Sequence, residues 1–283
     1  MKKGLIMEGG AMRGMFTCGV IDVFLEEGIE FDGAAGISAG ATFGINFKSK
    51  QIGRGLRYNK KYSKDPRYCS LRSLIKTGDL YGVQFCYYDI PNKHDPFDYE
   101  TYKNNPMEFY VGAMDIEKGE VLYHRCDDCG ANDMKWIQAT ASLPVVSRVV
   151  EVDGHKMLDG GMIESVPYQP MLDRGYDRNV VILTQPREYR KEKTKIIPLV
   201  KLKLRKYPKV AEAMKIRHIV YNKLIDRINK DEDEGKVLVI RPQESLGIKR
   251  TEKDPDELER VYQEGRKEAY RRLEEVKKYL EIN

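Results

Sequence analysis

A serine framed by glycines is the residue best placed to do chemistry. The segment 36–40 reads GISAG, which has the pattern G-x-S-x-G, and it lies between a short apolar run and a stretch of small residues. In this pattern the glycines leave room for a sharp turn that places the serine hydroxyl at the start of a helix, where backbone N–H groups favour negative charge. The sequence therefore indicates that Ser38 is a nucleophile in acyl transfer, with a helix N-cap as the alternative interpretation.

Two further segments could supply the groups that such a serine needs. The segment 8–14 reads EGGAMRG, follows an apolar run and carries few side chains, so its N–H groups could stabilise an oxyanion. Asp159 is followed by Gly160 and Gly161, so its carboxylate could approach a serine hydroxyl without steric hindrance. None of the four histidines lies in a loop framed by glycines, so a dyad of Ser38 and Asp159 is the simplest interpretation.

These three segments together resemble the motifs of the patatin-like phospholipase family. That family carries a glycine-rich oxyanion loop D-G-G-G-x-R/K-G after its first strand, then a G-x-S-x-G nucleophile, then a D-G-G/A motif. The resemblance covers residues 4–185, and two positions depart from the pattern: Glu8 replaces the usual aspartate and Ala11 replaces the third glycine. Ala11 still supplies an N–H group, but it would be strained if the loop requires a positive φ at that position.

The resemblance implies a lipid acyl-ester hydrolase of the phospholipase A or lysophospholipase type. Ser38 would attack the ester carbonyl, Asp159 would act as general base, and no metal or other cofactor would be needed. The oxyanion hole would consist of the N–H groups of Gly9, Gly10 and Ala11. Supporting positions would be Arg13, Gly14, Gly36, Gly40, Gly160 and Gly161. Arg13 would either hold a phosphate or orient the loop, and the alternative is that it pairs with an acidic residue such as Glu8 or caps structure.

The same resemblance implies an α/β fold with three α/β/α layers, a mostly parallel central sheet and a helical C-terminal tail. We expect one patatin-like domain over residues 1–283, with the motifs in a core of residues 4–185 and a basic, helical extension over 186–283. The ester that is cut is not specified by the sequence. We expect the tyrosine-rich region 50–105 to line the acyl pocket.

Other functions stay open at this stage. Residues 9–14 loosely match the G-x-G-x-x-G of dinucleotide-binding proteins, but the middle glycine is missing. Ser38, Asp159 and His218 follow the chain order of a Ser-Asp-His esterase acting on soluble esters, although in that fold the nucleophile usually follows several strands. A non-catalytic module that binds lipid or protein on the same scaffold is a further alternative.

A separate group of residues has the spacing of metal ligands or of a redox pair. His124, Cys126 and Cys129 could supply three ligands to zinc, but no second C-x-x-C provides the fourth. Reduced thiols in a loop are therefore the expected state of Cys126 and Cys129.

The hydrophobic patterns predict the elements that must position these residues. We expect buried strands at residues 3–7, 34–37, 109–114, 179–184 and 236–240. We expect hairpins over 109–123 and 149–158, helices following residues 14 and 38, a helix over 136–141 and one beginning after residue 254. Surface helices and loops are expected over 50–105.

Composition and charge limit the classes of protein that fit. Of the 283 residues, 41% are hydrophobic and 33% are charged, which is typical of a globular chain with a well-solvated surface. The net charge of +5 does not indicate a nucleic-acid partner, and no recognition motif suggests one. No apolar run is long enough to span a membrane, and the five scattered cysteines suggest a cytoplasmic protein.

Positive charge is concentrated in one segment. Residues 187–223 hold thirteen Lys and Arg against three Glu, and within 195–217 these cations alternate with apolar residues. Such a mixture predicts peripheral contact with an anionic surface, at the inner face of the membrane, with a solvated face as the alternative. Pro198 and Pro208 are expected to interrupt any single helix there.

Overall fold

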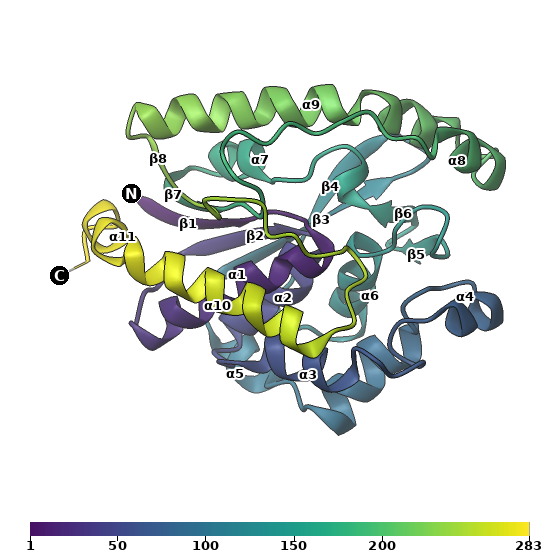
Figure 1. The fold of residues 1–283 in the computed structure, drawn as a ribbon, viewed down its shortest axis with the longest axis horizontal. Helices are drawn as coiled ribbons and strands as arrows, with labels where there is room; N and C mark the ends of the chain where they lie inside the picture. Colours follow the sequence, from purple (N-terminus) through teal and green to yellow (C-terminus); the bar gives the residue numbers. More distant parts are fainter. Residues whose placement is uncertain (283) are drawn as a thin grey trace.

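The protein is built around one eight-stranded sheet, shown in Figure 1. The structure is a computed structural model that describes residues 1–282. The strands are β1 (Lys2–Met7), β2 (Gly33–Ile37), β3 (Glu108–Asp115), β4 (Glu120–Arg125), β5 (Val150–Val152), β6 (His155–Asp159), β7 (Tyr176–Ile182) and β8 (Val237–Ile240). Their order is β5-β6-β3-β2-β1-β7-β8, with β4 paired to β3. The five strands β3, β2, β1, β7 and β8 are parallel to one another, and the two hairpins form an antiparallel end.

Helices cover both faces of this sheet. The α-helices are α1 (Gly14–Glu26), α2 (Ala39–Lys48), α3 (Arg54–Tyr62), α4 (Leu71–Thr77), α5 (Tyr99–Asn104), α6 (Ala131–Thr140), α7 (Tyr168–Asp173), α8 (Ile197–Lys203), α9 (Pro208–Asp233), α10 (Pro255–Arg271) and α11 (Leu273–Tyr279). Shorter or irregular turns are η1 (Ala11–Arg13), η2 (Phe85–His94, π-helical) and η3 (Gly160–Met162). In Figure 1, α7 and α9 lie above the sheet, and α1, α2 and α10 lie below it.

The core residues of β1 show why both faces must be covered. Successive side chains of a strand point to opposite faces. Leu5 and Met7 accordingly pack into the hydrophobic cluster shared with α1 and α10, whereas Ile6 packs into the cluster shared with α7 and α9. The predicted α/β/α layers with a mostly parallel sheet and a helical C-terminal region are therefore confirmed.

Most predicted elements are present, and two helices differ from expectation. Both hairpins form, and the second turns through Asp153 and Gly154, which have positive φ. The expected C-terminal helix is divided at Arg272 into α10 and α11. The 26-residue helix α9 lies in the expected helical extension, but the sequence pattern does not predict its length; Pro208 starts it, as is typical of a proline in the first turn.

The structure also describes the state of the cysteines and the character of the helices. All five cysteines are free thiols, and Cys86 is the only one of them that is not fully buried. Within residues 1–282, no helix combines the length and the apolar character that crossing a bilayer requires.

Candidate active site

Three chain segments meet where the parallel strands end. The segment 8–14 follows β1, and Ser38 follows β2, which lies beside β1 in parallel register. Asp159 is the last residue of β6, which runs antiparallel to β3. It pairs with Ala113, which is next to Gly112, the partner of Ile37 in β2, so the register places Asp159 at the same edge as Ser38. The carboxyl ends of parallel strands share one edge of a sheet, which is the usual place for a ligand in this class of fold. The structure thus brings all three predicted motifs to one edge.

The backbone at Ser38 has the conformation of a strained turn. Its φ is 53° and its ψ is −121°, a region that residues other than glycine rarely occupy. The Ser38 N–H donates to Thr140 Oγ1 at 2.8 Å, and Thr140 in turn donates to the Gly112 carbonyl at 2.5 Å. Helix α2 starts directly after the turn, since the Thr42 N–H donates to the Ser38 carbonyl at 2.9 Å. The turn is therefore held in place from both the sheet and α6.

The glycines on either side of Ser38 are required by close packing. A Cβ atom at Gly36 would lie 2.5 Å from the Ala41 nitrogen, and one at Gly40 would lie 2.3 Å from the Met7 carbonyl oxygen. Both distances are shorter than real contacts allow, so any side chain would separate α2 from the strands. The G-x-S-x-G spacing is thus explained by the packing of strand, turn and helix.

Asp159 is a buried carboxylate held beside Ser38. The residue is 3% exposed, and one carboxylate oxygen accepts the Gly161 N–H at 2.7 Å. Burial raises the pKa of Asp159 above its ordinary value, while hydrogen bonding from the Ser38 side chain, the Gly161 N–H and the charge of Arg217 act in the opposite direction. A carboxylate with a raised pKa next to a hydroxyl is suited to accept a proton.

The loop 8–14 presents two free amides near Ser38. The Gly9 N–H donates to the Ser165 carbonyl at 2.9 Å, so this amide already has a partner. Within residues 1–282, the N–H groups of Gly10 and Ala11 donate to no acceptor. Ala11 has φ 51°, which is the positive value at which alanine is strained.

Glu8 and Arg13 hold this loop rather than pairing with each other. Glu8 is buried and accepts hydrogen bonds from the Thr184 N–H at 2.6 Å, the Thr184 hydroxyl at 2.9 Å and the Tyr221 hydroxyl at 2.8 Å. Arg13 Nε donates to the Thr184 hydroxyl at 3.4 Å. The carboxylate that replaces the usual aspartate is therefore fully used in joining β1, β7 and α9.

An apolar cavity opens beside Ser38. Its wall includes Ala11 and Ser38 and extends over the region 50–105. That region contributes Arg54, Tyr58, Tyr68, Tyr81, Cys86, Tyr87, Ile90, Pro91 and Phe97.

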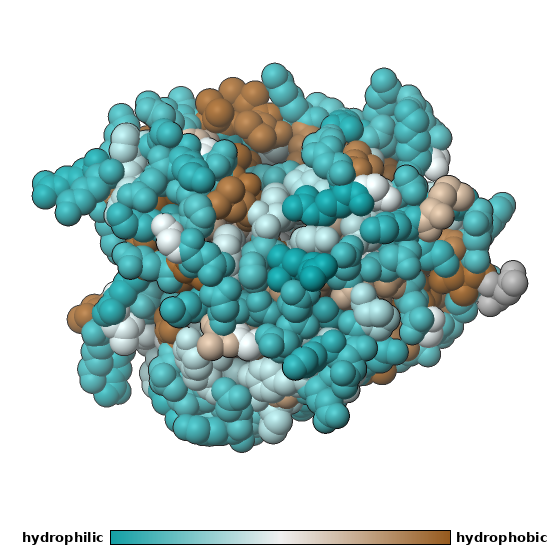
Figure 2. Space-filling view, turned by 180° about the vertical axis from the view of Figure 1, so that it is seen from behind, coloured by the Kyte–Doolittle hydropathy of each residue, from teal (hydrophilic) through white to brown (hydrophobic). Residues whose placement is uncertain are grey.

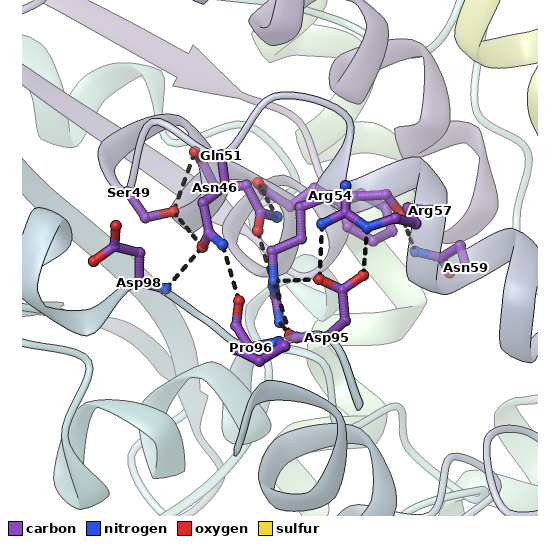
Figure 3. Close-up of polar contacts among 11 residues, drawn as sticks. Asn46, Ser49, Gln51, Arg54, Arg57, Asn59, Asp95, Pro96 and Asp98 are labelled. Atoms are coloured by element: carbon purple, nitrogen blue, oxygen red, sulfur yellow. Dashed lines mark hydrogen bonds and ion pairs between the residues drawn. The ribbon is translucent and has the colours of Figure 1, made fainter. Parts of the chain in front are cut away.

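A network of polar contacts, shown in Figure 3, fastens this wall to α2. Arg54 is 4% exposed and donates to Asn46 Oδ1 at 2.9 Å and to the Asp95 carbonyl at 2.8 Å. Arg57 makes a bidentate pair with the Asp95 carboxylate, both bonds measuring 2.8 Å. The network thus positions the cavity wall relative to the helix that begins at Ser38.

A second cavity lies on the Asp159 side, where several cations stand in a mostly apolar lining. It has a volume of about 580 Å³ and is lined by Asp159, Gly161 and several cations of the segment that follows β7. His218 lines this cavity too, but within residues 1–282 it has no hydrogen bond with Ser38 or Asp159, and its Nδ1 is buried without a partner. The predicted residues of a histidine triad are therefore near one another without being connected.

The predicted metal or redox group is assembled in part. His124, Cys126 and Asp133 bring potential ligand atoms within 4.8 Å of one another. His124 Nε2 lies 2.7 Å from Asp133 Oδ1, and Asp133 Oδ2 accepts the N–H groups of Asp128 and Cys129. The ring of His124 stacks on Trp136, with centroids 5.0 Å apart. Both Asp133 oxygens thus already serve to hold the loop that follows β4.

Sequence reasoning missed the residues that support the site from a distance. Thr140 of α6 contacts Ser38, while Thr184 after β7 and Tyr221 of α9 both contact Glu8. Their positions follow from tertiary packing, and no local pattern distinguishes them. Lys191 and Arg217 belong to the basic segment but line the cavity on the Asp159 side, whereas the sequence suggested a surface role for that segment.

Comparison with known proteins places the chain in a family. Residues 5–172 match the family model described as patatin-like phospholipase, and residues 207–281 match one described as a domain of unknown function, DUF6363. The uncharacterized protein YjjU of Escherichia coli K12 is 27% identical over 195 residues, which cover 64% of this chain and 52% of YjjU. The lysophospholipase NTE1 of Cryptococcus neoformans is 22% identical over 199 residues, which cover 66% of this chain and 12% of NTE1.

The chain thus spans about half of YjjU and a smaller part of NTE1. The crystal structure of VipD from Legionella pneumophila superimposes with a TM-score of 0.48 at 12% identity, covering 97% of this chain and 67% of VipD. The family model alone accounts for more than half of the chain, including all three motifs of the site. The chain belongs to the patatin-like phospholipase family.

Proposed function

We propose that the protein is a serine acyl-ester hydrolase that acts on lipids through a dyad of Ser38 and Asp159. The observation that carries this proposal is the strained turn at Ser38, with φ 53°, next to a buried carboxylate whose pKa is raised. Strain of this kind costs about 1–3 kcal/mol and is retained where a site needs it. The family membership and the apolar cavity at Ser38 support a lipid as the substrate.

The proposed reaction proceeds in two steps. Asp159 accepts the hydroxyl proton as Ser38 Oγ bonds to the ester carbonyl carbon, and the alcohol leaves with that proton. Water then attacks the acyl-enzyme and gives a proton to Asp159, which passes this proton to Ser38 Oγ as the bond to the acyl carbon breaks and the fatty acid is released. The N–H groups of Gly10 and Ala11 would bind the oxyanion in both steps, since they have no other acceptor within residues 1–282. Gly9 would contribute only if its amide left Ser165.

The acyl chain would occupy the apolar cavity. Ser38 lines that cavity, and most of the wall consists of aromatic and aliphatic side chains. Burial of a hydrocarbon chain there gains about 0.8 kcal/mol per methylene group. This gain favours an ester with a hydrocarbon acyl chain over a polar ester as the substrate.

Two substitutions test the dyad. We expect Ser38→Ala and Asp159→Asn each to reduce hydrolysis of a lipid ester by about 100-fold or more, because each removes a partner in proton transfer. Asp153→Asn is the matched control, since Asp153 lies in the turn of the same hairpin and is exposed. Circular dichroism checks that each variant is folded. Activity of Asp159→Asn within several-fold of the parent would overturn the assignment of Asp159 as the base.

A second proposal concerns the location of the protein on a membrane surface. Ile196, Leu199 and Leu202 are 44%, 48% and 73% exposed on and just before α8, next to the cations of the same segment. Figure 2 shows hydrophobic atoms gathered along the top of the molecule, where α9 lies, on a surface that is otherwise mostly hydrophilic. We propose that the segment 195–217 contacts an anionic bilayer from the cytoplasmic side.

Sedimentation with lipid vesicles tests this contact. We expect binding to vesicles that contain phosphatidylserine, with weaker binding to vesicles of phosphatidylcholine alone. Leu202→Glu should reduce that binding, whereas Ile52→Glu, at a residue 45% exposed outside this segment, should not. Equal binding of the two variants would contradict the assignment of the segment 195–217.

A further inference from the structure

The segment that matches DUF6363 is packed into the fold that carries the candidate site. Residues 207–281 include α9, β8, α10 and α11. Strand β8 extends the parallel sheet beside β7, and α9 and α10 cover opposite faces of that sheet (Figure 1). Helix α10 lies so close to α1 that a Cβ atom at Gly265 would overlap the Phe16 carbonyl oxygen. The segment therefore contributes to both layers of helices around the sheet, and α9 can reach the edge where the dyad lies.

Two side chains of α9 reach the motifs of the site. The Tyr221 hydroxyl donates to Glu8 Oε1, at the start of the oxyanion loop, at 2.8 Å. Arg217 lies four residues earlier, on the same face of the helix, and lines the cavity on the Asp159 side. A Cβ atom built on Gly161 would lie 3.7 Å from Arg217 Nη2. One face of α9 thus meets both the oxyanion loop and the segment that carries the proposed base.

Arg217 brings a charge that no carboxylate in contact with it neutralises. In the described part of the chain, residues 1–282, Arg217 makes no ion pair within 4.0 Å, and its Nε is buried without a hydrogen-bond partner. By contrast, Arg190 of the same cavity is paired with Asp226 at 2.9 Å. Burial lowers the pKa of Arg217, and among its charged neighbours Asp159 opposes this effect most strongly. The free positive charge of Arg217 is therefore directed mainly at the proposed base.

Arg217 is also the strongest cation acting on Asp159. Burial raises the pKa of Asp159, while the Ser38 hydroxyl, then Arg217 and then Lys191 act in the opposite direction. Lys191 is a weaker source of charge, because burial and repulsion from Arg217 lower its own pKa well below the ordinary value. Tyr87 of η2 interacts with Asp159 too, but burial raises the pKa of its hydroxyl and keeps it neutral. A guanidinium stays charged at any ordinary pH, so Arg217 is the lasting positive charge near Asp159.

We propose that Arg217 is a positioning residue of the dyad, whose charge keeps the buried Asp159 carboxylate ionised and therefore able to take the proton of Ser38. A protonated carboxyl group could not act as that base. Arg217 acts through Asp159, and Tyr221 supports the oxyanion loop from the same face of α9. The proposal rests on the proposed acyl-hydrolase function. It assigns a role in the reaction to the segment that matches a domain of unknown function.

The pH dependence of kcat/KM tests this role. The substrate is 4-nitrophenyl butyrate, which carries no charge, so the cations of the cavity do not attract it. Because hydrolysis requires ionised Asp159, kcat/KM falls toward acid pH. Arg217→Gln should move this fall to higher pH. On the acid side it should lower kcat/KM by about tenfold, the low end of the effect that an opposite charge has on a nearby carboxylate, with little change on the plateau at higher pH.

Two variants serve as controls, and circular dichroism checks that each is folded. Arg217→Lys keeps a positive charge on a side chain of similar length, so its pH profile should stay close to that of the parent. Arg190→Gln removes a cation of the same cavity that is already paired with Asp226, so its profile should not move. If Arg217→Gln loses the same factor at every pH, its role is merely structural and the proposal is wrong.

Unfolding free energies test the same charge effect without any hydrolysis. A double-mutant cycle of Arg217→Gln and Asp159→Asn in urea measures how strongly the two side chains interact in the folded protein. The interaction should favour the folded state at about pH 8, where Asp159 is ionised, and should shrink at about pH 4, where its raised pKa leaves it protonated. A packing contact would give the same interaction at both pH values.

The two experiments separate this proposal from the hydrolase function. If the parent hydrolyses neither this ester nor a lipid ester, the proposed function fails, and the double-mutant cycle alone decides the role of Arg217. If the parent is active and Arg217→Gln leaves the acid side of the profile unchanged, the function stands and the proposal is overturned. An interaction between Arg217 and Asp159 that is absent at about pH 8 would overturn it as well.

Discussion

Replacing Asp95 with alanine tests how the wall of the apolar cavity is fastened to α2. The Asp95 carboxylate accepts two hydrogen bonds from Arg57, and its Oδ1 lies 3.5 Å from Arg54 Nε. Removing the carboxylate leaves the guanidinium of Arg54 buried without a counter-ion, and a change of this kind costs about 3–5 kcal/mol of stability. We expect the lower value, about 3 kcal/mol, because Arg54 keeps its hydrogen bonds to Asn46 and to the Asp95 carbonyl. The free energy of unfolding should fall by that amount.

Urea unfolding followed by circular dichroism measures this change. Arg57→Ala is the control, because the Arg57 side chain is 54% exposed and its pair with Asp95 should contribute about 1 kcal/mol or less. If Asp95→Ala costs no more than Arg57→Ala, the charge of Asp95 does not compensate the buried Arg54, and our reasoning about the cavity wall is wrong.

Three further predictions concern the loop, stability at different pH values, and the base. Ala11→Gly should stabilise the protein by about 0.5–1 kcal/mol in thermal or urea unfolding. The relief of left-handed backbone strain in the folded state should exceed the cost of the larger entropy that glycine gives the unfolded chain, and a destabilised variant would contradict this. Burial raises the pKa of Asp22 to about 6, so the folded state binds the proton of Asp22 more tightly than the unfolded state does. The resulting stabilisation is present at acid pH and is lost as pH rises from about 4 through 6. The free energy of unfolding of Asp22→Asn, relative to that of the parent, should therefore rise by up to about 3 kcal/mol as the pH increases from 3.5 to 7. If this difference between variant and parent does not change with pH, the prediction is wrong. Hydrolysis should need ionised Asp159, whose pKa is raised by burial, so log kcat/KM should fall with decreasing pH at a midpoint above that of an ordinary aspartate.

The sequence predicts the edge of the sheet that carries the candidate site better than the surroundings of that edge. The short apolar runs at β1 and β2 and the glycines around Ser38 are local signals, and their consequences follow from strand and turn geometry. The turn at Asp153 and Gly154 was equally local, and it delivers Asp159 to β3. These features could be predicted because each depends on a few adjacent residues.

The surroundings depend on contacts between distant segments. The bond from Ser38 to Thr140 joins residues 102 positions apart, and the bond from Tyr221 to Glu8 joins residues 213 positions apart. Nothing in the local pattern of α9 marks Tyr221 or Arg217 as facing the site, since the helix reads as a basic surface segment. The positive φ at Ala11 was likewise left open by the sequence, because it follows from how the loop meets β7 and α9.

The most direct test of the central claim is the intact mass of the protein after incubation with a fluorophosphonate probe, with Ser38→Ala run beside it. An activated serine attacks such a probe and keeps the phosphonyl group, whereas ordinary serines do not. Our account predicts a single adduct on the parent and none on Ser38→Ala. A folded parent that forms no adduct, or an adduct that persists in Ser38→Ala, would contradict it.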